Sequence, residues 1–321
     1  MFRKHTRRAA KAAFAISFGV ALLIGLTACG GGGGSSSTTA PTTTASGPKP
    51  TITLGTKNFG EEYILGQLYG QALQAKGFPV TYKGSFGSSE LADKAITSGK
   101  MNFYPEYTGV VVLDLAKAKN APKSANATYV AAKKFEDGRG LTMLNPTPFA
   151  DTDTFTMLTS TAQKDGLKTM SDLKKLKSFS YAGYPECQTR ITCILGMKQI
   201  YGLNNIKFVP IGSISVYTLL DQGKATGGDG FSTDPAQLNH KKYTALVDDK
   251  HIFGFQNVAP VLKASLLKGP NGALLASTAN AVSAKLTLPA MQAMNKAYYV
   301  DKATPKQIAH GFLAANGLLT K

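Results

Sequence analysis

Patterns typical of strands and helices alternate between residues 51 and 104, and this alternation restricts the fold more than any other feature of the chain. Runs in which apolar and polar residues alternate are followed by loops and then by runs with apolar residues at helical spacing. Gly77 and Gly99 mark the predicted helix ends. The predicted order is strand, helix, strand, helix, strand, over residues 51–55, 61–76, 80–82, 89–98 and 101–104. This order predicts an α/β fold with right-handed crossovers.

The third predicted strand leads directly into the sequence Pro-Glu-Tyr-Thr-Gly at residues 105–109. Because proline has no N–H to donate to a strand ladder, Pro105 predicts that this strand ends at Tyr104. Open α/β sheets bind ligands at strand ends, and the face of a tyrosine ring attracts cations, quaternary ammonium above all. The alternative is that Tyr104 and Tyr107 are half-buried aromatic residues beside a turn.

The remainder of the chain repeats the α/β pattern and then becomes helical. A strand predicted within residues 151–158 carries the chain into a second lobe, and helices are predicted over most of residues 271–316. With 321 residues, 43% of them hydrophobic, the chain is long enough for a substantial core in two lobes. The order of elements therefore predicts two α/β lobes joined by two crossing strands.

Lysine and arginine exceed aspartate and glutamate by 17 in the whole chain, and part of this excess lies within residues 1–28. The other basic residues are scattered along the sequence. Nucleic-acid binding would require a basic stripe with interleaved aromatic residues, which the sequence lacks. We therefore expect no nucleic-acid partner, and a weak attraction to anionic lipid or wall polymers fits the charge better.

Residues 1–28 have the features of an export signal, with a basic start and an apolar run over residues 12–26. This run is shorter than the ~20 apolar residues of a membrane-spanning helix. The sequence Leu-Thr-Ala-Cys at residues 26–29 resembles a lipobox, so we expect Cys29 to carry a diacylglycerol thioether. Its position and small neighbours favour lipidation over an ordinary cleavable signal. Residues 30–50, rich in Gly, Ser, Thr and Pro, predict a flexible tether that holds the body outside the cell membrane.

Two cysteines remain after Cys29, namely Cys187 and Cys193. In an exported protein such a pair can form a disulfide, which would stabilise a short loop. The alternative is metal binding, but none of the four histidines has ligand spacing to these thiols. We expect a structural disulfide, no metal site and no cofactor.

Several motifs, in their shared order and spacing, resemble the substrate-binding proteins of osmoprotectant ABC importers, which bind glycine betaine, choline, carnitine and related quaternary amines. The matching motifs lie at residues 57–59, 63–66, 99–104, 105–109, 232–234, 248–250 and 259–261. The resemblance covers nearly the whole body after residue 51. It implies a type II periplasmic-binding-protein fold, with a first lobe at residues 51–150 plus 258–321 and a second lobe at 151–257. It also implies delivery of the solute to a membrane permease, and we expect a monomer that is not an enzyme.

The resemblance also implies roles for individual residues. In the family, aromatic side chains from both lobes surround the trimethylammonium group, and the matching positions here are Tyr107, Phe155, Phe231 and Phe255. The last three are often tyrosine in the relatives, and phenylalanine makes the box more apolar. Lys57 and Arg190 match the positions that meet the ligand carboxylate, and Tyr104 and Thr108 are further candidates.

Structural roles for the same residues remain open. Lys57 could be a solvated loop lysine, Arg190 could pair with Glu186, and Phe231 and Phe255 could belong to the core. The ligand could also be another small cationic or zwitterionic solute. A secreted lipoprotein enzyme is the competing class, but the sequence contains no Gly-x-Ser-x-Gly, no His-Glu-x-x-His and no P-loop. A wall-anchored adhesin or structural lipoprotein would not need loops clustered at strand ends.

Overall fold

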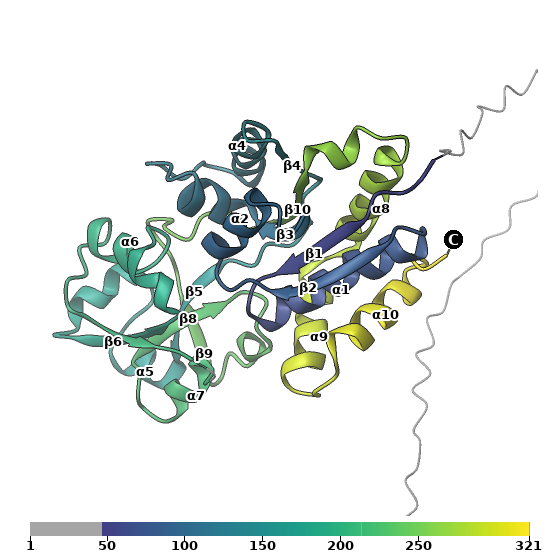
Figure 1. Cartoon of the computed structure of the whole chain (residues 1–321). Coiled ribbons are helices and arrows are strands. Elements are labelled where there is room, and N and C mark those ends of the chain that lie inside the picture. Colours follow the sequence, from purple (N-terminus) through teal and green to yellow (C-terminus); the bar gives the residue numbers. More distant parts are fainter. Residues whose placement is uncertain (1–46, 213, 321) are drawn as a thin grey trace, which may run out of the picture. The chain divides into compact units, whose positions relative to one another are not determined.

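The computed structural model describes residues 47–212 and 214–320 of the chain, and these contain two five-stranded sheets (Figure 1). The predicted export signal at 1–28, the lipidation site Cys29 and most of the predicted tether lie outside the described residues. In the part of the chain that the structure describes, no helix has the length and apolar character needed to cross a bilayer.

The first sheet has the strand order β2-β1-β3-β10-β4. Its strands are β1 (Ile52–Thr56), β2 (Val80–Ser85), β3 (Phe103–Tyr107), β4 (Leu141–Met143) and β10 (Val258–Lys263). Strand β1 runs parallel to β2 and β3, as the right-handed crossovers of a βαβ order require, whereas β10 is antiparallel to both of its neighbours. The first lobe therefore includes a strand that comes from much later in the sequence.

The second sheet has the strand order β7-β6-β8-β5-β9. Its strands are β5 (Asp153–Leu158), β6 (Phe179–Gly183), β7 (Ile206–Pro210), β8 (Gly227–Phe231) and β9 (Tyr243–Leu246). Strands β6, β7 and β8 are parallel, and β5 runs antiparallel to β8 and β9. Each sheet thus combines parallel strands with one antiparallel strand that enters from a segment joining the two lobes.

Helices cover both sheets (Figure 1). Those of the first lobe are α1 (Gly60–Ala75), α2 (Ser89–Thr97), α3 (Thr108–Val110), α4 (Ala125–Asp137), α8 (Gly272–Lys285), α9 (Leu288–Tyr299) and α10 (Pro305–Ala315). Those of the second lobe are α5 (Thr159–Lys164), α6 (Ile194–Gln199) and α7 (Val216–Asp221). One buried cluster joins Leu68 of α1, Leu275 of α8 and Leu313 of α10 to Ile52 of β1. The C-terminal helices therefore complete the core of the N-terminal lobe.

The chain crosses between the sheets twice, and the two crossing segments lie side by side. Ala150 and Asn257 form an antiparallel bridge, and the N–H of Asp151 donates to the carbonyl of Gln256 at 3.0 Å. Asp151 and Gln256 consequently lie at the junction of the lobes. The lobe boundaries after residues 150 and 257 stay a prediction from the sequence.

The prediction that Pro105 ends a strand is wrong. Strand β3 continues through Pro105 to Tyr107, and Pro105 faces Pro260 of β10. Residues that face each other in an antiparallel ladder alternate between hydrogen-bonded and non-hydrogen-bonded pairs, and two prolines are tolerated in a non-hydrogen-bonded pair because neither needs to donate. Tyr104 is therefore an interior residue of the strand, and Tyr107 lies at its end.

Candidate functional site

A pocket lies where the two sheets meet, and it is lined from both lobes and from the crossing segments. Its lining includes Lys57, Phe59, Tyr107 and Val110 of the first lobe, Tyr184, Glu186, Arg190, Asp229 and Phe231 of the second lobe, and Asp151, Asp153 and Gln256 at the junction. Tyr107 and Phe231 are the last residues of β3 and β8, so strand ends supply the pocket from both sheets.

Three aromatic rings form one wall of this pocket. The Phe59 ring stacks near Tyr107 with ring centres 6.2 Å apart and planes inclined by 19°, and it stacks near Phe231 at 6.2 Å with planes inclined by only 2°. Phe59 occupies the N-cap position of α1, and Phe231 belongs to the second lobe. Aromatic faces from both lobes are therefore brought together through Phe59, which sequence reasoning did not select although it ends the Lys-Asn-Phe motif.

Lys57 is a buried member of this wall. Its side chain is 3% exposed, and its Nζ lies 4.0 Å from the centre of the Tyr107 ring. The ammonium forms ion pairs with Glu106 and, at 3.5 Å, with Glu62. Burial raises the pKa of Glu62 to about 8, against the opposing charge of Lys57. The interpretation of Lys57 as a solvated lysine is therefore wrong, because its ammonium is buried and held by carboxylates of the protein itself.

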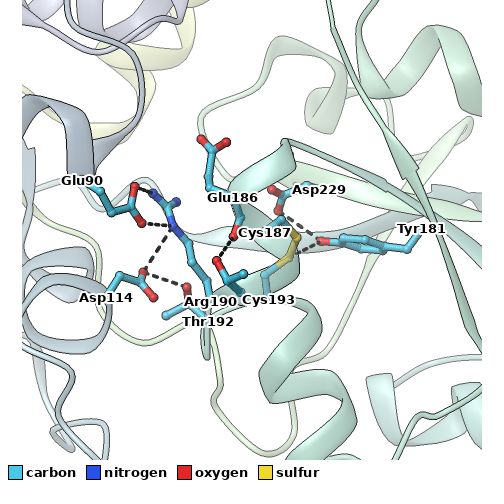
Figure 2. Close-up of a disulfide and its surroundings, with 10 residues drawn as sticks. Glu90, Asp114, Tyr181, Glu186, Cys187, Arg190, Thr192, Cys193 and Asp229 are labelled. Atoms are coloured by element: carbon cyan, nitrogen blue, oxygen red, sulfur yellow. Dashed lines mark hydrogen bonds and ion pairs between the residues drawn. A yellow bond between two sulfur atoms is a disulfide. The ribbon is translucent and has the colours of Figure 1, made fainter.

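Arg190 links the two lobes beside the pocket (Figure 2). Its Nε and Nη2 donate to the two carboxylate oxygens of Glu90 in α2 at 3.1 and 3.0 Å, and its Nε lies 4.0 Å from Asp114. Burial alone would raise the pKa of Glu90, but the guanidinium hydrogen bonds and charge lower it to about 2. Glu186, the alternative partner left open by the sequence, forms no ion pair with Arg190 within the described residues.

The disulfide Cys187–Cys193 closes the loop that carries Arg190, and its Cα atoms lie 5.2 Å apart (Figure 2). Within this loop, the Thr192 hydroxyl donates to Asp114 of the first lobe at 2.9 Å. Both cysteines are buried and line the pocket. Their sulfur atoms lie near the carboxylate of Asp229, but sulfurs bonded to each other are not thiolate metal ligands. The disulfide thus fixes a loop that contacts the opposite lobe.

Carboxyl groups gather at the junction. Asp151 and Asp229 are buried, and Asp153 and Glu186 are half-buried beside them. Burial and, to a lesser degree, repulsion from Asp114 raise the pKa of Asp153 to about 7. Burial also raises the pKa of Asp151 and of Asp229 well above the usual range, and Asp229 accepts a hydrogen bond from the Tyr181 hydroxyl at 3.1 Å. A bound cation would relieve this accumulation of acidic groups.

Two predicted aromatic positions lie inside the cores. Phe155 is fully buried, with ring centres 5.2 Å from Tyr181 and 5.8 Å from Phe179. Asp153, two residues earlier, reaches the pocket, and two residues advance a strand by about 6.6 Å, which places Phe155 deeper in the lobe. Tyr104 is also fully buried, because β3 continues past it. Neither side chain lines the pocket, so these two assignments are corrected.

Two further predicted residues lie near the pocket without lining it. The chain turns at Gly254, which has a φ of +65°, and the Phe255 side chain is 37% exposed. The next residue, Gln256, is buried and lines the pocket. Thr108 is buried, and its hydroxyl donates to the Phe255 carbonyl at 3.0 Å. Of the predicted residues, the structure therefore brings Lys57, Tyr107, Arg190 and Phe231 to the pocket.

Comparison with known proteins agrees with this arrangement. The family described as the substrate binding domain of ABC-type glycine betaine transport system matches residues 50–315. A glycine-betaine-binding protein of Pseudomonas aeruginosa is 30% identical over 286 residues, which cover 84% of this chain and 89% of that protein. A crystal structure described as a glycine betaine/carnitine/choline ABC transporter superposes with a TM-score of 0.67 at 23% identity, over 84% of this chain and 99% of that one.

A second solved structure, a choline-binding protein of an ABC transporter in complex with choline, superposes with a TM-score of 0.64 at 13% identity. The superposition covers 83% of this chain and 89% of the choline-binding protein. Two α/β lobes around a junction pocket, together with these superpositions, show a periplasmic-binding-protein fold. The chain belongs to the family of substrate-binding domains of ABC-type glycine betaine transport systems.

Proposed function

We propose that this chain captures a small quaternary ammonium solute in the junction pocket and delivers it to an ABC permease in the membrane. The observation that carries the proposal is the wall formed by Phe59, Tyr107 and Phe231, which faces a junction rich in carboxyl groups. A quaternary ammonium cannot donate hydrogen bonds, so it is recognised by aromatic faces and negative charge, each aromatic contact contributing about 0.5–2 kcal/mol. Relatives named for glycine betaine and for carnitine transport support this class of ligand.

Closure of the two lobes accompanies capture in this proposal. Phe59 and Tyr107 belong to one lobe and Phe231 to the other, so a cation between them interacts with both lobes only when they approach each other. The paired crossing segments at Ala150 and Asn257 are the natural hinge. The ligand then shifts the population towards the closed form, which the permease recognises.

In this proposal the protein acts outside the cytoplasm, as its family does. Lipidation of Cys29 and the tether that follows would hold a monomeric body near the permease. Globomycin treatment of the producing cells tests this part, because blocked cleavage of a lipoprotein signal would leave a precursor that is larger by 28 residues.

The experiment that tests the proposed function is calorimetric titration with choline, glycine betaine, carnitine and proline betaine. We expect saturable binding of at least one of them without chemical turnover. Phe231→Ala should weaken that binding by about tenfold or more, given the strength of an aromatic–cation contact. Phe255→Ala is the matched control, because it removes the same side chain outside the pocket. Equal effects of the two substitutions, or no binding of any of these compounds, would contradict the proposal.

A further inference from the structure

The two basic side chains that line the pocket are already neutralised by acids of the protein. Within residues 47–212 and 214–320, these are Lys57 and Arg190. Lys57 contacts Glu106 and lies 3.5 Å from Glu62. The Nε and Nη2 of Arg190 both donate hydrogen bonds to the Glu90 carboxylate. At each of these two cations, a carboxylate of the protein therefore already occupies the position that the carboxylate of a zwitterionic ligand would take.

The junction carboxyl groups have the opposite character, because none of them has a basic partner. Among the described residues, no lysine or arginine forms an ion pair with Asp151, Asp153 or Asp229. Asp151 accepts hydrogen bonds from the hydroxyl and the N–H of Thr233, and Asp229 accepts one from Tyr181. Asp151 and Asp229 thus contact only neutral donors within the described part of the protein, and a bound cation would find carboxyl groups with no competing ion pair.

We infer that this pocket selects a quaternary ammonium with a neutral polar tail, such as choline, over zwitterionic betaines. The reason is that Glu90 already accepts the hydrogen bonds of Arg190 Nε and Nη2, the paired donors called here the Arg190 fork. The inference rests on the proposed function and names the class of solute that the site prefers. Discrimination arises from an unfavourable contact as well as a favourable one. The carboxylate of a betaine would lose its hydration next to three unpaired aspartates, and it would have to displace Glu90 to reach the guanidinium.

Glu90 and Arg190 come from different lobes, so their contact forms together with closure. Glu90 lies in α2, and Arg190 lies in the loop closed by Cys187–Cys193. The side chain of Glu90 is 38% exposed, whereas that of Arg190 is 18% exposed. Glu90 contacts the guanidinium without lining the pocket itself, so its replacement leaves the aromatic wall untouched. This makes Glu90→Gln a suitable probe of ligand charge selection.

The test compares choline with glycine betaine on wild type and Glu90→Gln by calorimetric titration. In wild type we expect choline to bind about tenfold more tightly than glycine betaine, and in Glu90→Gln the ratio should fall at least several-fold as the Arg190 fork becomes free. Glu136→Gln is the matched control, because Glu136 pairs with Arg139 at 2.8 Å and does not line the pocket. Its choline-to-betaine ratio should equal that of wild type.

A second variant keeps the inference testable if Glu90→Gln folds poorly. Asp153→Asn removes one junction charge and should weaken choline binding more than betaine binding. Betaine binding more tightly than choline in wild type would overturn the inference and leave the proposed function intact. An unchanged ratio in folded Glu90→Gln, or equal losses for both ligands in Asp153→Asn, would also overturn it. Binding of neither ligand, nor of carnitine or proline betaine, would instead overturn the proposed function.

Discussion

The ammonium of Lys57 lies 4.0 Å from the centre of the Tyr107 ring, and the Tyr107 hydroxyl donates to the Glu61 carboxylate at 2.9 Å. One face of this ring is therefore engaged by a cation of the protein, and its edge is fixed by a buried acid. Glu61 is 2% exposed and also accepts a hydrogen bond from Asn295 of α9 at 2.7 Å. Tyr107 is consequently held in place before any ligand arrives.

Tyr107→Phe should lower stability more than it lowers affinity. The substitution keeps the aromatic face but removes one hydrogen bond to the buried Glu61 carboxylate, a loss of about 1–3 kcal/mol. Denaturant unfolding should show this decrease in the free energy of unfolding, and titration with the preferred quaternary amine should show a change of less than about threefold. An affinity loss as large as that of Tyr107→Ala would show instead that the hydroxyl contacts the ligand.

Phe155→Ala should destabilise the second lobe. The ring is fully buried, and a Cβ on Gly227 of the adjacent strand β8 would lie only 2.2 Å from it, so the ring fills a closely fitted space. Removing a buried phenylalanine side chain usually costs about 3–5 kcal/mol. Thermal unfolding should show the loss, whereas Phe231→Ala should leave the melting temperature of the unliganded protein nearly unchanged. A variant of Phe155 that keeps its stability but loses ligand binding would contradict this placement.

Loss of the disulfide should lower both stability and affinity. Replacing Cys187 and Cys193 together by serine opens a loop with a sequence separation of 6, for which loop-closure entropy gives about 2 kcal/mol. Since Arg190 and Thr192 of this loop contact the first lobe, we also expect weaker ligand binding through less complete closure. Calorimetric titration of the double variant against wild type measures this effect. Identical affinities would show that the loop keeps its conformation without the bond.

Binding of a quaternary ammonium should weaken as the pH falls through about 7. The pKa of Asp153 is raised to about 7 by burial and by repulsion from Asp114, with Arg190 and Lys57 opposing that shift. Asp151 and Asp229 are the other acids that face Asp153. Protonation of Asp153 at lower pH removes a negative charge from the junction, so the affinity for a cation decreases. Titrations between pH 5.5 and about 8.5 test this, and Asp153→Asn should flatten the profile.

The stability of the unliganded protein should decrease as the pH rises, whereas its affinity for a quaternary ammonium should increase. A carboxyl group whose pKa is raised on folding holds its proton more tightly in the native state than in the unfolded chain. The stabilisation from Asp153 and Glu62 is therefore present at low pH and is lost as the pH rises from their ordinary pKa values, 3.8 and 4.5, to about 7 and about 8. Denaturant unfolding at several pH values should show this decline, and a rise over the same range would contradict the assigned directions.

The sequence predicted the α/β architecture because strands and helices have different apolar periods. The helices predicted over residues 61–76 and 89–98 differ from α1 and α2 only at their ends. It failed at Pro105, where the identity of the facing residue decided the outcome. Whether a proline interrupts a strand depends on the ladder position that it occupies, and Pro260 lies 155 residues away.

Pocket-lining residues at strand ends could be predicted, and contacts between lobes could not. Tyr107 and Phe231 end β3 and β8, and a family motif marked both. The depth of Phe155 in β5 depends on where the strand meets the crossing segment, which local pattern does not encode. The partner of Arg190 is Glu90, 100 residues earlier and in the other lobe, whereas the resemblance implied a ligand carboxylate and left Glu186 as an alternative.

The most direct test of the proposed site is a crystal structure with the tightest-binding quaternary amine. We predict that the ligand nitrogen lies in the junction pocket, within about 6 Å of the ring centres of Phe59 and Phe231, with the junction carboxyl groups around it. A nitrogen bound outside this wall, or a ligand that contacts only one lobe, would contradict the account.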